Sequence, residues 1–533
     1  MRCLFPTLFL VLLTSQPILS YNYLVFCPLF AHSHHKFLAK IADTLTLAGH
    51  NVTFLVPVIV REYENIKYLE HTTDVVYIQP DEELEKIGED ADYSMFWKAD
   101  FGIFSFVPAV QRFNKMFEQF SDNLRKDLSV LDKLKDRKFD AMIFEALAFC
   151  AHQNRVNFSQ FPAIHDYLGI KAIFPSWSMT HMTELSKSIG EPASPSFVPT
   201  TVSPFGDQMT FQERLLNTIG DLSGFLLAPP AMRSYKYPHQ VLDIEEIKSK
   251  APFVFVNSNP FLDFPRPTLS KTIAIGGISV NVTQMREEKL SEEFDDILKK
   301  REKSVLISFG SILRSSEMPD EYKYTIVRVI KSLPDVTFIW KYETKDIKFA
   351  KNLPNLHFSK WVPQTALLAD SRLTAFITHA GLGSVNELSY LGKPAILIPI
   401  FADQFRNAMM LARHNGSITL VRKDLGDFEK LKKSVDAILN DESYQINAKT
   451  LSHQLESQPF SPHDLLVKYA EYGARFGEIP SLDPYHRKMS FVSFFMIDII
   501  LFLSVILIGF VALLVFVVRL ILRTILIRKL KIN

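Results

Sequence analysis

Two long stretches of the chain alternate short apolar runs with segments whose apolar residues recur at helical spacing. Strands buried on both faces of a parallel sheet read as continuous apolar runs, and the helices between them carry one apolar face. The alternation therefore predicts an α/β fold class with two parallel-sheet domains. The expected strands lie near residues 23–27, 52–56, 75–78, 141–144, 171–174 and 253–257 in the first domain, and near 305–309, 336–340, 373–377 and 395–400 in the second.

Longer apolar runs lie at the two ends of the chain. Arg2, an apolar run over residues 4–13 and small or polar residues up to Ser20 have the order of a secretory signal peptide, with a buried strand or helix as the alternative. Residues 499–518 are uninterrupted apolar sequence. At about 1.5 Å per residue such a run crosses a bilayer core of about 30 Å, which predicts one transmembrane helix.

The charges that flank the apolar run predict its orientation. More basic residues follow the run than precede it, so the tail is expected in the cytosol and the bulk of the chain in the lumen. The basic residues are Arg487 and Lys488 before the run, and Arg519, Arg523, Arg528, Lys529 and Lys531 after it. The last five residues, Lys-Leu-Lys-Ile-Asn, resemble a dilysine retrieval signal, although they also suit a basic stop-transfer flank. We therefore expect a single-pass type I protein of the endoplasmic reticulum membrane with lumenal domains.

The composition excludes several classes of function. Lys and Arg number 59 against 58 Asp and Glu, so no strong positive field recruits nucleic acid. Once Cys3 leaves with the signal, Cys27 and Cys150 remain, which is no disulfide framework, and the chain has no Cys-x-x-Cys for a structural zinc site. The Asp-x-Asp at residues 90–92 lies in an acidic stretch typical of a solvated face. In a lumenal protein, the sequons at Asn51, Asn157, Asn281 and Asn415 are candidate sites of N-glycosylation.

The segment from Trp361 to Gln404 carries the strongest motif. It combines Trp-Val-Pro-Gln at 361–364, the turn Thr-His-Ala-Gly-Leu-Gly-Ser at 378–384, Glu387, and Phe-Ala-Asp-Gln at 401–404. A strand that opens through glycines into a helix offers backbone N–H groups to a pyrophosphate, although Gly-x-Gly alone often only permits close packing. The whole combination resembles the signature of the UDP-glycosyltransferases. The chain as a whole is similar to the membrane-anchored UDP-glucuronosyltransferases of animals.

The resemblance implies a GT-B fold, with two Rossmann-like domains facing a cleft. The implied boundaries are 1–20 for the signal peptide, 21–265 for the acceptor-binding domain, 266–480 for the UDP-sugar-binding domain, 481–498 for a lumenal juxtamembrane segment, 499–518 for the membrane helix and 519–533 for the cytosolic tail. A proline-stiffened connection at residues 263–267 separates the domains. Residues 97–134 and 179–250 interrupt the strand–helix alternation and are expected to line the acceptor pocket, with a plain aromatic core as the alternative.

The resemblance also assigns donor-binding roles. Trp361 would stack on the uracil, Gln364 would help to hold the base, and Glu387 would accept hydrogen bonds from the ribose. Phosphates would meet Ser311, His379 and the turn at Gly381, Gly383 and Ser384; sugar hydroxyls would meet Asp403 and Gln404. Vertebrate relatives often have Asn where this chain has Gly383, so a side-chain phosphate contact is lost here or is replaced by Ser384.

A catalytic pair is implied at the first strand. Its end runs into three histidines, of which His34 aligns with the family's general base, while His32 and His35 are expected to have structural roles. Glu145 stands where relatives have the Asp that orients this base, and a solvated strand-end Glu is the alternative. Three histidines without a carboxylate or cysteine beside them do not indicate a metal site.

Together these features predict an inverting enzyme that transfers a sugar, most simply glucuronic acid, from its UDP donor to a hydroxyl of a small lipophilic acceptor in detoxification. The UDP-sugar is a co-substrate, and neither a cofactor nor a metal is expected. No Gly-x-Gly-x-x-Gly follows the first strand, which argues against a dinucleotide oxidoreductase. Expected partners are the donor, the acceptor, the membrane and a homo- or hetero-oligomer, but no nucleic acid. The alternatives are a non-catalytic nucleotide-sugar-binding subunit, and an enzyme that uses UDP-glucose or UDP-N-acetylglucosamine.

Overall fold

The structure is a computed structural model that describes residues 20–89, 94–98, 115–117, 119–120, 123–124, 127–146, 160–201, 203–226, 234–237, 240–243, 248–350 and 353–530. The chain divides into two compact units, Met1–Leu482 and Asp483–Asn533. Several predictions lie outside the described residues. They are the signal peptide up to residue 19, Cys3, Cys150, the sequon at Asn157, the Asp-x-Asp at 90–92 and the last three residues of the tail.

Within the described residues, a sheet of seven parallel strands forms the first half of the larger unit. Their order is β3 (Asp74–Ile78), β2 (Asn51–Pro57), β1 (Asn22–Phe26), β4 (Ala141–Glu145), β5 (Ala172–Trp177), β8 (Val254–Val256) and β9 (Thr272–Ala274). The six strands predicted for this domain are confirmed. β9, a three-residue strand at the edge of the sheet, was not predicted.

Helices connect these strands. They are α2 (His32–Leu47), α3 (Glu82–Glu89), α4 (Met95–Lys98), α6 (Ser129–Lys135), α8 (Gln160–Tyr167), α9 (Thr183–Ile189) and α10 (Phe211–Leu226), with a hairpin of β6 (Ser234–Tyr237) and β7 (Gln240–Asp243). One face of α2 carries Leu38, Ile41 and Leu45, which are fully buried against the sheet. This packing fixes the start of α2 at the carboxyl end of β1.

Six parallel strands in the described part of the chain form the second sheet, in the order β12 (Leu356–Ser359), β11 (Val336–Lys341), β10 (Lys303–Ser308), β13 (Leu373–Thr378), β14 (Ala395–Leu397) and β15 (Ser417–Thr419). The four strands predicted here are confirmed. β14 ends at Leu397, earlier than residue 400, since Pro399 has no N–H to continue the ladder. β12 and β15, which complete the sheet at its edges, are short and were not predicted.

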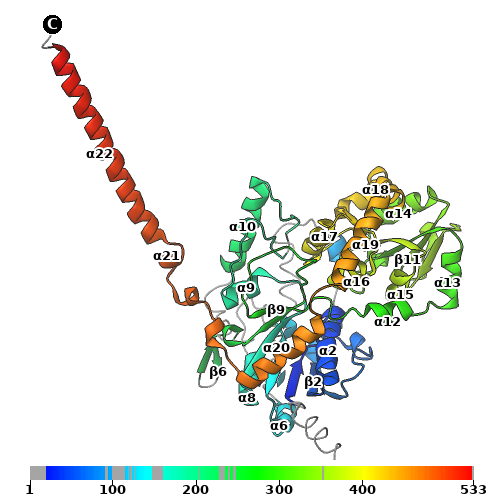
Figure 1. Ribbon diagram of the computed structural model, residues 1–533. Helices are drawn as coiled ribbons and strands as arrows, with labels where there is room; N and C mark the ends of the chain where they lie inside the picture. Colours follow the sequence, from blue (N-terminus) through cyan, green and yellow to red (C-terminus); the bar gives the residue numbers. More distant parts are fainter. Residues whose placement is uncertain are drawn as a thin grey trace, which may run out of the picture. The chain divides into compact units, whose positions relative to one another are not determined.

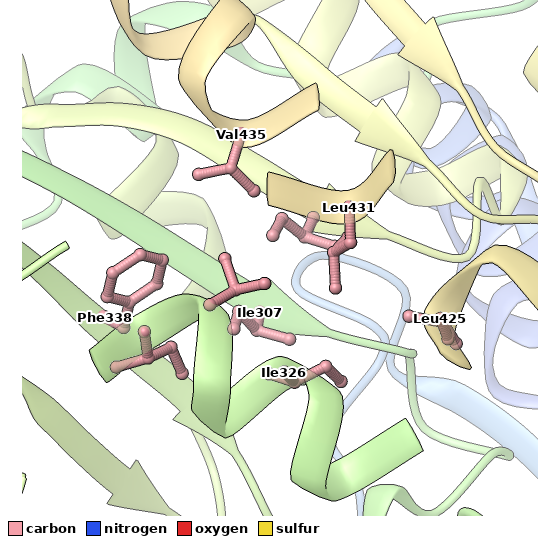
Figure 2. Close-up of a pocket in the computed structure, with 9 residues that line it drawn as sticks. Ile307, Ile326, Phe338, Leu425, Leu431 and Val435 are labelled. Carbon is pink, nitrogen blue, oxygen red and sulfur yellow. The ribbon is translucent and has the colours of Figure 1, made fainter. Parts of the chain in front are cut away.

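The helices of the second half cover this sheet. They are α12 (Val282–Glu287), α13 (Glu292–Lys299), α14 (Asp320–Lys331), α15 (Gln364–Ala369), α16 (Leu382–Leu391), α17 (Gln404–Ala412), α18 (Phe428–Asn440) and α19 (Glu442–Glu456). Where α14 and α18 meet the sheet, a cavity of about 10 Å³ remains. Figure 2 shows the apolar side chains around it, among them Ile307, Ile326, Phe338, Leu425, Leu431 and Val435. With apolar walls and room for at most one water, this cavity is a packing gap in the core.

One helix after the second sheet returns to the first. α20 (Pro462–Phe476) contacts α2, β5 and β9, and Figure 1 shows α2 and α20 side by side. A Cβ added at Gly473 would lie 2.5 Å from the ring of Phe174, so only glycine permits this close approach. The first sheet therefore includes β9, and α20 packs against it, although both follow residue 265 in the sequence. The domain boundaries at 265 and 480 stay predictions.

The smaller unit contains α21 (Phe491–Phe494) and α22 (Ile497–Leu530), which is drawn as one uninterrupted helix in Figure 1. Among the described residues, Ile497–Arg528 of α22 is the one segment that is long and apolar enough to cross a membrane. The side chains described along this helix are mostly exposed, as the side chains of a lipid-facing helix would be. The predicted span, residues 499–518, lies inside α22.

Candidate active site

The carboxyl edge of the first sheet brings the predicted catalytic pair together. His34 lies in the first turn of α2, directly after β1, and Glu145 is the last residue of the neighbouring strand β4. His34 Nδ1 lies 3.2 Å from Glu145 Oε2, and the Glu145 side chain is fully buried. With the Nδ1 proton directed at this carboxylate, His34 Nε2 is free to act as a base.

Ser178 is a third member of this cluster that the sequence analysis missed. It follows β5, the next strand in the sheet, and its hydroxyl lies in hydrogen-bond contact with His34 Nδ1. Asn257, after β8, donates its amide to the Ser178 carbonyl oxygen at 2.8 Å. In the sequence, Ser178 is marked only by its place at a strand end. The order of the strands in the sheet is what places it beside His34.

An apolar surface borders the base. The ring of Phe30 lies 4.8 Å from that of His34, and Phe117 packs edge-on against Phe30 at 5.4 Å. Phe30 and Phe117 are both buried. Phe117 comes from the segment 97–134 that was expected at the acceptor pocket, so a described part of that segment does lie near the base.

The other two histidines of the cluster pack inside the domain. His32 Nδ1 lies 3.0 Å from the Tyr68 hydroxyl, and His35 packs against the rings of Phe54 and Tyr68. Burial lowers the pKa of His32 to about 4 and that of His35 to about 3, so both are neutral at neutral pH. No group of three or more His, Cys, Asp or Glu among the described residues could hold a metal ion, and metal independence itself stays a prediction.

The carboxyl edge of the second sheet collects the predicted donor-binding residues. Ser311 follows β10, Trp361 follows β12, His379 follows β13 and Asp403 follows β14. In open α/β sheets, ligands bind outside the carboxyl ends of the strands. Ser311 is exposed, and Trp361 as a residue is 66 % exposed, which is unusual for so large an apolar side chain.

Glu387 stands at the centre of a small polar network. Its Oε2 accepts from Gln364 Nε2 at 2.6 Å, and the same Nε2 lies 3.1 Å from the Ser384 hydroxyl. Lys36, on the helix that carries the base, places its Nζ 3.7 Å from Glu387 Oε1. Gln364 therefore orients Glu387 and Ser384, and Lys36 brings a cation of the first half to this pocket.

The predicted phosphate turn, residues 378–384, is built closely around His379. A Cβ added at Gly310 or at Gly381 would lie 2.6 and 2.7 Å from ring atoms of His379, so both positions require glycine. Burial, with a contribution from Lys341, lowers the pKa of His379 to about 4. A neutral imidazole cannot supply a positive charge here, which leaves that task to the N-terminus of α16 and to Lys341.

Lys341 is the second residue that the sequence analysis missed. It ends β11, and its Nζ donates to the Gly310 carbonyl oxygen at 2.8 Å and lies 5.6 Å from the centre of the Trp361 ring. A lysine after an apolar strand gives no signal in a single sequence. Only the adjacency of β11, β10 and β12 places this ammonium between the predicted uracil and phosphate positions.

The loop after β14 differs in detail from what was expected. Asp403 Oδ2 accepts from Asn407 Nδ2 at 2.9 Å, while burial raises the pKa of Asp403 against the opposing effects of Asn407 and His34. The contact of Lys36 Nζ with Glu387 Oε1 at 3.7 Å shows that α2, the helix that carries the base, lies against the second half. Gln404 Oε1 already accepts from the backbone N–H groups of Ile400 and Phe401 at 2.9 and 3.0 Å, so its amide nitrogen is the group left for a sugar.

The sequence of the chain matches a known family. The family described as "UDP-glucoronosyl and UDP-glucosyl transferase" matches residues 24–532. The chain belongs to this family. It is a glycosyltransferase, and the predicted membership is confirmed. UDP-glucuronosyltransferase 1A9 of Homo sapiens is 27 % identical over 486 residues, covering 88 % of this chain and 86 % of the human one. The Caenorhabditis elegans protein ugt-50, provisionally named a UDP-glucuronosyltransferase, is 27 % identical over 508 residues and 91 % of each chain.

Solved structures confirm the predicted GT-B fold class. A UDP-glucosyltransferase of Polygonum tinctorium, solved in complex with 3,4-dichloroaniline, aligns with a TM-score of 0.55 at 15 % identity. The alignment covers 87 % of this chain and 99 % of the plant chain. At 15 % identity this similarity concerns the fold alone. The aligned part of this chain is large enough to include both of its sheets.

Gly383 offers a direct test of the phosphate turn in this glycosyltransferase. An added Cβ there would meet no atom within 4 Å, so Gly383→Asn is expected to fold normally. An amide facing a phosphate adds a charge-assisted hydrogen bond, and we expect UDP to bind about fivefold more tightly, corresponding to roughly 1 kcal/mol. Titration calorimetry with UDP measures the change, and uridine, which has no phosphate, is the control. Unchanged UDP affinity would mean that residue 383 does not face the phosphates.

Proposed function

We propose that this glycosyltransferase transfers glucuronic acid from UDP-glucuronic acid to a hydroxyl of a small lipophilic acceptor, with inversion. The observation that carries the proposal is the His34 imidazole, held on Glu145 Oε2 at 3.2 Å, on a helix whose Lys36 Nζ lies 3.7 Å from Glu387 Oε1 of the second half. A base and a donor-binding carboxylate on opposite sides of one site suit transfer between two substrates. The names of the human and worm relatives favour glucuronic acid as the sugar.

In the proposed reaction, His34 Nε2 takes the proton of the acceptor hydroxyl as its oxygen attacks the anomeric carbon. The bond from this carbon to the β-phosphate oxygen breaks, and UDP leaves with the electron pair. Glu145 stabilises the imidazolium that forms and keeps the Nδ1 proton in place. A single displacement on an α-linked donor gives a β-glycoside.

The donor would lie along the carboxyl edge of the second sheet. Trp361 stacks on the uracil, Glu387 accepts from the ribose hydroxyls, and Asp403 and Gln404 bind the sugar. Negative charge on the departing UDP is stabilised by the backbone N–H groups that begin α16 and by the Lys341 ammonium, which lies beside Gly310. These groups supply the stabilisation without a metal or cofactor, and the UDP-sugar is a co-substrate.

The acceptor would approach His34 from its apolar side. Phe30 and Phe117 form the surface next to the base, and apolar aromatic walls select lipophilic molecules. Such acceptors partition into membranes, so an anchored enzyme meets them at high local concentration. We propose a type I orientation in the endoplasmic reticulum membrane with the catalytic unit lumenal, on the basis of the basic residues after the apolar helix.

Donor competition tests the proposal. Full-length protein in detergent is incubated with phenols and steroids and with UDP-glucuronic acid, UDP-glucose or UDP-N-acetylglucosamine, and UDP release is measured. We expect the highest kcat/KM with UDP-glucuronic acid. Preference for another donor would overturn the assignment of the sugar. UDP binding without turnover on any donor would favour a non-catalytic subunit.

The basic tail provides a separate prediction about subcellular localisation. A retrieval signal is recognised by a receptor and does not anchor the protein. Its localisation and its membrane orientation should therefore depend on different residues. Changing Lys529 and Lys531 to Ser is expected to let the protein escape towards the cell surface, while Arg519, Arg523 and Arg528 keep its orientation. Immunofluorescence and endoglycosidase sensitivity measure the shift. Unchanged reticulum residence would place retention in the lumenal unit or the span.

A further inference from the structure

A short helix of the first half is buried in the core of the second. α4 (Met95–Lys98) lies between β3 and β4 in the sequence, so by position it belongs to the predicted acceptor-binding domain. Phe96 and Trp97 nevertheless belong to the apolar core around β10, β11 and β13 of the donor half. Trp97 is 1 % exposed and is among the largest fully buried side chains of the protein.

Trp97 holds the loop that follows β10. Its ring packs edge-on against Phe309 at 5.1 Å, and its Nε1 donates to the Arg314 carbonyl oxygen at 3.0 Å. Phe309 and Arg314 lie on either side of Ser311, the predicted phosphate contact. One indole therefore fixes both ends of this phosphate loop, which we define as residues 309–314.

Phe96 holds the loop that follows β14. Its ring stacks on Phe401 with 4.4 Å between centroids and 18° between planes, and its carbonyl oxygen accepts from Arg422 Nη1 at 2.5 Å. Phe401 is followed by Ala402, whose φ of 54° is rare for a residue with a side chain, and then by Asp403. Such a conformation persists only where surrounding contacts hold it. The Phe96–Phe401 stack is one of those contacts in this sugar loop, which we define as residues 400–404.

We propose that Phe96 and Trp97 are positioning residues of the donor site, with Phe96 setting the sugar loop and Trp97 setting the phosphate loop. The inference rests on the proposed function, because that function gives the two loops their roles. It adds that a segment of the acceptor half determines donor recognition. Since each aromatic residue contacts a different loop, the two should affect different parts of the donor.

A series of three ligands separates these effects. Uridine tests the base and ribose, UDP adds the phosphates, and UDP-glucuronic acid adds the sugar; each is titrated by calorimetry into the full chain in detergent. For Phe96→Leu we expect UDP-glucuronic acid to bind about tenfold more weakly, with UDP and uridine within twofold of wild type. For Trp97→Phe, which keeps a ring and loses the Nε1 donor, we expect UDP and UDP-glucuronic acid to weaken about fivefold and uridine to be unchanged.

Phe338 provides a matched control for simple loss of core packing. It is buried in the same core and lines the cavity of Figure 2. Phe338→Leu is expected to lower the melting temperature without changing the ratios among the three affinities. Phe401→Leu removes the stack of Phe96 from the other side, so it should reproduce the Phe96→Leu profile and serves if Phe96→Leu does not fold. Phe309→Leu serves in the same way for Trp97.

The outcomes are distinct. Equal weakening of all three ligands by the Phe96 and Trp97 variants, or affinities unchanged from wild type, would overturn the positioning roles. If wild-type protein bound none of the ligands, or bound UDP-glucuronic acid without any turnover, the proposed function would fail instead. Wild-type binding and turnover combined with the two predicted profiles would support both.

Discussion

Replacing His34 by alanine is expected to lower the rate of glycosyl transfer by about 10²-fold or more while UDP affinity stays within twofold. The imidazole lies at the carboxyl edge of the first sheet and is assigned no contact with UDP, so its loss should remove the proposed proton acceptor and leave the proposed UDP contacts in place. Rates are measured at saturating donor and acceptor, and affinity by calorimetry. Near-normal turnover would transfer the role of base to another group, with His35 or His32 next to be tested.

Two further variants examine how the base is held. Glu145→Gln keeps the shape of the side chain but can present an N–H to His34 Nδ1, which favours the tautomer with the proton on Nε2. We expect the rate to fall more than the donor affinity, and Ser178→Ala to act in the same direction with a smaller effect. His32→Ala is the matched control, since His32 contacts Tyr68 instead of Glu145. An unchanged rate in Glu145→Gln would make this carboxylate a bystander.

Trp361→Ala is expected to weaken UDP binding by roughly 1–3 kcal/mol, the usual loss when a base no longer stacks on an aromatic ring. Trp361 is 66 % exposed as a residue and its ring lies near the Lys341 ammonium, so its side chain is accessible to a ligand such as UDP. Because this ring is not buried in the core, we expect little change in the melting temperature. Glu387→Ala should also weaken UDP binding, through the ribose.

Calorimetry with UDP on the full chain checks this prediction. Tyr324→Ala is the control, because Tyr324 is 53 % exposed on α14 but is assigned no donor contact. UDP affinity should be unchanged in that variant. If Trp361→Ala and Glu387→Ala also bound UDP as wild type does, the donor pocket would have to be placed elsewhere.

The sequence predicted the strands that form continuous apolar runs; most of them are buried on both faces, and the partly exposed edge strand β3 is the exception. It did not predict β9, β12 and β15, which have three or four residues and lie at sheet edges. It placed the candidate site residues at strand ends, where the turn at residues 378–384 follows β13 and Glu145 ends β4. Ser178 and Lys341 were missed, because their meaning depends on which strands are neighbours.

By itself, the sequence determined the fold class, the family and the long apolar helix, because local patterns of apolar residues, glycines and charges indicate each of them. The tertiary structure alone decided which distant residues meet. His34 and Glu145 are 111 positions apart and meet because β1 and β4 are adjacent. Trp97 and Arg314 are 217 positions apart and meet because α4 packs into the other half. Contacts of this kind arise from strand order and core packing, which no local pattern in one chain encodes.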